Sequence, residues 1–78
     1  MAKEIIITNN IRRLRFFAQE MTQSELAEKA GASRQTIIAL EAGKYSPSLE
    51  LAFRIAAVFE VSVNEVFECH IKGGDNNE

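Results

Sequence analysis

The stretch TQSELAEKAGASRQTIIALEAGKYSPSL, residues 22–49, carries the pattern that decides the fold. Thr22 precedes Glu25 by three residues, the spacing of a capping box in which each side chain accepts a hydrogen bond from the other residue's backbone amide. A helix is therefore predicted to begin at Gln23, and Gly31 fits the left-handed position that follows a helix C-terminus. The apolar stripe of this helix consists of Leu26, Ala27 and Ala30.

A second helix is predicted to follow almost at once. Ser33 can cap a helix over residues 34–42, and Gly43 offers another C-terminal stop. Ile37 and Leu40 stand three residues apart and are expected to face the core. The side of this helix that faces away from the core mixes charged, polar and apolar residues, which is unusual for a solvated face. We expect the functional residues there. This side holds Arg34, Gln35, Thr36, Ile38 and Ala39.

Two helices joined by so short a turn have the spacing of a helix-turn-helix, here over residues 23–42. Ala27 is small enough to let the helices approach, and Gly31 allows the sharp turn between them. Ile37 and Leu40 hold the second helix against the rest of the domain. The N-terminal edge of that helix is then free to enter a major groove.

Outward from this motif, apolar periodicity predicts three more helices, over residues 10–19, over residues 49–59 and, briefly, after the second capping box of Ser62 and Glu65. Both ends of the chain have strand patterns, and residues 4–8 are expected to pair with residues 67–72 in antiparallel fashion. The predicted fold is therefore mainly α, with five helices and a small two-stranded sheet. It occupies residues 1–72 as a single domain, and the polar tail 73–78 is expected to fray.

Composition excludes several classes of protein. The chain has 78 residues, one Cys, one His and no Trp, and its acidic residues are scattered. Cys69 and His70 make neither an intrachain disulfide nor a metal-ligand set, and their alternation with neighbouring apolar residues is typical of a strand. We therefore expect no enzyme, no metal and no cofactor. No apolar stretch approaches the roughly 20 residues that span a bilayer, and a cytoplasmic protein without membrane contact is expected.

The formal net charge of −2 argues against a protein that coats DNA without specificity. The arrangement of charge matters more than its sum, because five cationic residues fall in two segments that could face DNA: Arg12, Arg13, Arg15, Arg34 and Lys44. Of these, Arg12 and Arg13 are expected mainly to form a solvated helical face.

Residues 22–27 and 33–49 resemble the phage-repressor and Cro family, also called XRE-like helix-turn-helix regulators, and the similarity extends from Asn10 to about Phe67. It is strongest to short stand-alone regulators, some of which are dimers with an added two-stranded sheet. The resemblance implies a five-helix domain like that of the lambda repressor. It implies a sequence-specific regulator, expected to be a repressor, that binds a pseudo-palindromic operator as a homodimer.

The resemblance also implies roles for individual residues. Gln23 would contact a phosphate and brace the reading helix, and Gln35 would be the chief base reader, since its amide matches adenine N6 and N7. Arg34 would reach guanine or a phosphate, and Arg15 would pair with Glu41. Further DNA contacts are expected from Ser33, Thr36, Ala39, Lys44, Tyr45 and Ser46.

Dimer contacts are expected around Val63, Val66 and Phe67, together with the terminal strands. A small-molecule effector is not expected, because so small a core leaves little room for a pocket. The alternative is a protein-interaction module, such as an antitoxin-like partner, on the same scaffold. The acidic balance of the chain keeps this alternative open.

Overall fold

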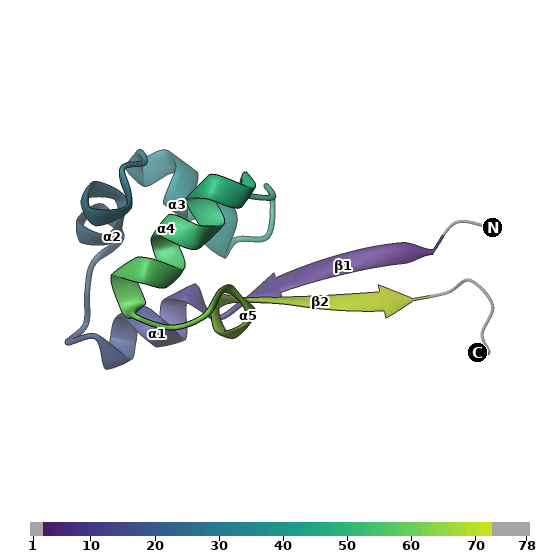
Figure 1. Cartoon of the computed structure of the whole chain (residues 1–78). Helices are drawn as coiled ribbons and strands as arrows, with labels where there is room; N and C mark the ends of the chain where they lie inside the picture. Colours follow the sequence, from purple (N-terminus) through teal and green to yellow (C-terminus); the bar gives the residue numbers. More distant parts are fainter. Residues whose placement is uncertain (1–2, 73–78) are drawn as a thin grey trace.

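The computed structural model describes residues 3–72, so the expected frayed tail lies outside the described residues. One strand precedes the five helices and another follows them, which confirms the predicted fold class. Figure 1 shows the helices gathered into one body from which the two strands project together. In chain order the elements are β1 Glu4–Asn9, α1 Ile11–Phe17, α2 Gln23–Ala30, α3 Arg34–Glu41, α4 Leu49–Phe59, α5 Val63–Val66 and β2 Phe67–Lys72.

The helix starts in the motif are set by local hydrogen bonds. The Glu25 amide donates to Thr22 Oγ1 at 3.0 Å, and the Thr22 amide donates to Glu25 Oε1 at 2.8 Å, which completes the predicted capping box. Ser33 Oγ accepts from the Thr36 amide at 3.1 Å and so caps α3. Gly31 has φ of 73°, the left-handed conformation predicted for the end of α2.

The first helix is shorter than the predicted residues 10–19, because the chain reverses directly after Phe17. Gln19 and Glu20 both adopt left-handed backbone angles, with φ of 61° and 57°. This reversal lets the Met21 amide donate to the Arg15 carbonyl at 2.9 Å. Periodicity alone predicted a longer helix because neither residue is the glycine that usually marks such a turn.

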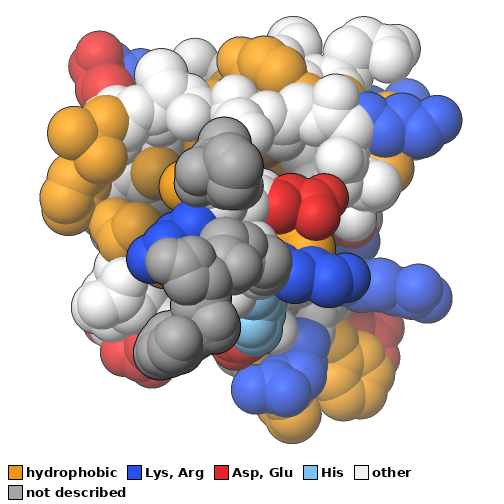
Figure 2. Space-filling view, turned by 90° about the vertical axis from the view of Figure 1, so that its right-hand side faces the viewer, with side chains coloured by type: hydrophobic (Ala, Val, Ile, Leu, Met, Phe, Trp, Pro, Cys, Tyr) orange, Lys and Arg blue, Asp and Glu red, His pale blue; other side chains and the backbone are white. Residues whose placement is uncertain are grey.

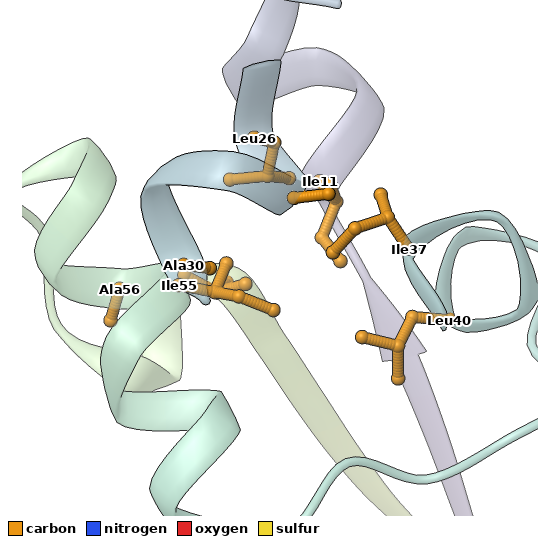
Figure 3. Close-up of a cluster of buried hydrophobic side chains, with 9 residues drawn as sticks. Ile11, Leu26, Ala30, Ile37, Leu40, Ile55 and Ala56 are labelled. Carbon is orange, nitrogen blue, oxygen red and sulfur yellow. The ribbon is translucent and has the colours of Figure 1, made fainter. Parts of the chain in front are cut away.

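The core is built from aliphatic side chains that all five helices contribute. Six of them are fully buried, namely Ile11, Leu26, Ile37, Leu40, Ile55 and Val66. Figure 3 shows most of them converging between α2, α3 and α4. Small residues keep the helices close, since Ala27, Ala30 and Ala56 are buried in the same cluster.

The two strands form a two-stranded antiparallel sheet, which we call the hairpin although its strands come from opposite ends of the chain. Its register places Ile5 opposite Ile71 and Ile7 opposite Cys69. Directly opposite residues point to the same side of a sheet, so these four side chains share one face. We call them the hairpin apolar face. Ile5 and Ile71 remain 61% and 64% exposed, because the hairpin extends beyond the helices. The opposite face alternates with it and is mostly polar.

A glycine at position 60 should stabilise the domain. Glu60 ends α4 in a left-handed conformation, with φ of 58°, which is unfavourable for a residue with a Cβ atom. We expect Glu60→Gly to raise the free energy of unfolding by about 0.5–1 kcal/mol, measured by urea denaturation. Glu60→Gln is the control, because it removes the charge and keeps the strained backbone. An equal gain in both variants would show that charge, not backbone strain, is the cause.

Candidate nucleic-acid interface

Helix α3 is anchored along one side and open along the other. Ile37 and Leu40 are buried, whereas Arg34 and Gln35 in its first turn are exposed. The Ser33 cap fixes where this turn begins, and Ser33 Oγ also lies 2.9 Å from Thr36 Oγ1. The first turn therefore presents one guanidinium and one amide to solvent from a fixed backbone.

The C-terminal end of α3 is tethered to α1 through the predicted ion pair. Arg15 donates from Nε and Nη2 to the two oxygens of Glu41, at 2.7 and 3.1 Å. Its third nitrogen, Nη1, donates to the Met21 carbonyl at 2.7 Å, so the guanidinium is almost fully used. The side chains of Arg15 and Glu41 are only 16% and 11% exposed.

Gln23 joins this ion pair, because its amide nitrogen donates to Glu41 Oε1 at 3.3 Å. The side chain thus braces α3, which is one of the two roles expected for it. A second tether was not predicted: Asn9 Nδ2 donates to the Leu40 carbonyl at 2.9 Å, while Asn9 Oδ1 accepts from the Ile11 amide at 3.1 Å.

An open groove of about 630 Å³ runs beside the ion pair, between α1, the start of α2 and α3. We call it the α1–α3 groove. It brings Gln23 and Arg34 together, as expected for two residues that act on one ligand. Its lining residues are Arg12, Arg15, Glu20, Met21, Thr22, Gln23, Ser24, Arg34 and Glu41. Arg12 was not among the predicted site residues.

The other predicted contact residues lie along α3 and the loop that follows it. Thr36 and Tyr45 line a smaller groove of about 230 Å³ that also reaches Gly31. Ala39 is half-buried, and its carbonyl accepts from the Lys44 amide at 3.0 Å, which folds the loop back on α3. Lys44 and Ser46 are exposed on this loop.

The three residues expected at a dimer interface differ in how far they are buried within their own chain. Val66 is fully buried within the core of its own chain, so its side chain has no surface to offer a second chain. The expectation for Val66 is wrong for this reason. Val63 and Phe67 are half-buried and keep part of their surface accessible.

Charge is distributed unevenly over the surface. Figure 2 looks along the hairpin from its free end, and Lys and Arg side chains gather mainly on the right half of the view. Hydrophobic side chains cover the left edge. An overall charge of −2 therefore coexists with a locally cationic side.

Within residues 3–72, no three His, Cys, Asp or Glu side chains come together as metal ligands. None of the helices in this part of the chain has the length and apolar character needed to cross a membrane.

A capped helix held against a preceding helix by a glycine turn, with its first turn projecting, defines a helix-turn-helix protein. The helix-turn-helix family model matches residues 11–66. The chain belongs to this family, in its XRE-type form, whose members are DNA-binding regulators and not enzymes.

Relatives with similar sequences occur in archaea and bacteria. A protein of Methanocaldococcus jannaschii named as an uncharacterized HTH-type transcriptional regulator is 60% identical over 47 residues, which cover 60% of this chain and 71% of the relative. A protein of Methanothermobacter thermautotrophicus with the same description is 58% identical over 48 residues, covering 60% and 70%. One from Bacillus subtilis is 44% identical over 46 residues, covering 59% and 70%.

Proposed function

We propose that the protein is a sequence-specific transcriptional regulator, acting as a repressor, that binds a pseudo-palindromic operator as a homodimer. The observation that carries this proposal is the first turn of α3, where Arg34 and Gln35 are exposed while Ile37 and Leu40 are buried. A helix held in this way can enter the major groove without losing its contacts to the core.

The chemistry of the exposed side chains suits base reading. The amide of Gln35 both donates and accepts, as adenine N6 and N7 require, and the guanidinium of Arg34 matches guanine O6 and N7. Thr36 and Ala39 supply small groups that suit a thymine methyl. Contacts to backbone phosphates are assigned to residues around the first turn of α3 and in the loop that follows the helix, namely Gln23, Ser33, Lys44, Tyr45 and Ser46.

The hairpin supports the homodimer. Its apolar face exposes Ile5, Ile7 and Ile71, and a second copy of the chain would cover them across a twofold axis. Phe67 lies two residues before Cys69 on β2 and continues this face toward the helices, and Val63 is a half-buried residue at the start of the adjoining α5. Two copies would present two α3 helices to half-sites about one helical turn apart, roughly 34 Å, which is why a pseudo-palindrome is proposed.

A charge placed on the hairpin apolar face should separate the protomers. We expect Ile7→Lys to sediment as a monomer at concentrations where the wild type is dimeric, because a buried unpaired ammonium is costly. Thr8→Lys is the matched control, since the neighbouring residue points to the opposite face and sits across from Glu68. Both variants dissociating, or neither, would place the dimer contact elsewhere.

The operator is tested by selecting bound duplexes from a random pool and sequencing them. Recovery of an inverted repeat supports both sequence reading and twofold symmetry. A titration with random duplex at low salt tests DNA binding itself, since phosphate attraction is greatest there. Undetectable binding under that condition would favour an antitoxin-like interaction module, which the net charge of −2 also suits.

A further inference from the structure

Arg12 lies in the α1–α3 groove together with Gln23 and Arg34, although it belongs to a different helix. It stands three residues before Arg15 on α1, so both side chains project from the same side of that helix. The sequence pattern favoured a solvated face for Arg12, with contact to DNA as the alternative. Its spacing from Arg15 is the signal that could have placed it beside the site.

The two arginines of α1 that line this groove differ in how their charge is used. Arg15 is neutralised by Glu41 and hydrogen-bonded at all three nitrogens. Arg12 is exposed, and no carboxylate within residues 3–72 forms an ion pair with it. The free cations of the groove are thus Arg12 and Arg34, against the single unpaired carboxylate of Glu20.

We propose that Arg12 contacts a phosphate of the DNA backbone and extends the interface from the helix-turn-helix onto α1. The inference rests on the proposed function, because the duplex must first be placed by α3. With Arg34 at one wall of the groove and Arg12 at another, the two guanidiniums flank an open polar space that a phosphate can enter. Arg12 fixes the register of the duplex and reads no base.

The test compares Arg12→Gln with Arg13→Gln in the full-length protein. Arg13 is adjacent, equally charged and exposed, but it does not line the α1–α3 groove. Binding is measured on the selected operator and on a random duplex across a series of salt concentrations. We expect Arg12→Gln to reduce the slope of log K against log salt by about 0.9, equivalent to about eightfold weaker binding at 0.1 M salt. The loss should be the same on both duplexes.

Arg13→Gln should change affinity by less than about twofold, since a charge outside the contact acts only through screened long-range attraction. Arg12→Lys should restore most of the affinity, and Glu20→Gln should strengthen binding by removing a repelling carboxylate from the groove. Equal losses in Arg12→Gln and Arg13→Gln would overturn the inference and leave the proposed function intact. A wild-type protein that binds neither duplex would overturn both.

Discussion

Glu41→Ala should lower the free energy of unfolding by about 3 kcal/mol, the largest loss expected from any change near the interface. The substitution leaves the guanidinium of Arg15 largely buried, with its bond to the Met21 carbonyl as the remaining partner. It also removes the acceptor of the Gln23 amide, so α3 loses its side-chain hydrogen bonds to both α1 and α2 at this point. Urea denaturation followed by circular dichroism measures the effect.

Two further variants separate the ion pair from simple loss of charge. Glu50→Ala removes the carboxylate of an exposed pair with Arg54 and should cost less than about 0.5 kcal/mol. The double variant Arg15→Met with Glu41→Leu should be closer to the wild type than Glu41→Ala, because no unpaired charge is left behind. If Glu41→Ala lowered the free energy of unfolding no more than Glu50→Ala, the Arg15–Glu41 pair would not hold the three helices together.

Gln35→Ala should cost about 1–3 kcal/mol of discrimination between the selected operator and duplexes altered at one A·T pair. The side chain is exposed and makes no hydrogen bond within residues 3–72, so the free energy of unfolding should stay within about 0.5 kcal/mol of the wild type. Asn64→Ala removes an exposed amide outside α3 and serves as the control. Competition binding with labelled duplex gives the discrimination directly.

The effect of Gln35→Ala must also be separated from phosphate binding. Loss of a base reader lowers affinity for the operator and leaves affinity for a random duplex nearly unchanged. Loss of a phosphate contact lowers both equally. If Gln35→Ala weakened binding to the operator and to the random duplex equally, Gln35 would contact the DNA backbone. Arg34 or Thr36 would then be the residue that reads the base.

Sequence patterns predicted the elements whose ends are determined locally. The capping box of Thr22 and Glu25, the Ser33 cap and the turn at Gly31 are interactions between near neighbours, and α2 and α3 begin where these signals place them. The strand pairing was predicted because each terminal segment has a strand pattern and needs a partner, and the simplest arrangement pairs the two with each other.

Other features depend on contacts that no local pattern contains. An apolar residue in a short helix can face its own core or a second chain with the same periodicity, and Val66 faces its own core. The left-handed Gln19 and Glu20 lack the glycine that would have signalled a turn. The link from Asn9 to Leu40 joins residues 31 positions apart, and the place of Arg12 depends on where α1 lies relative to the start of α2 and to α3.

Asn9 connects three elements of the domain. It is the last residue of β1, its oxygen holds the start of α1, and its nitrogen holds the last turn of α3. The side-chain amide of Asn9 therefore links the end of β1 directly to the last turn of α3. If the hairpins join two protomers as proposed, this link would help to set the distance between the two α3 helices, and with it the spacing of the half-sites that an operator must have.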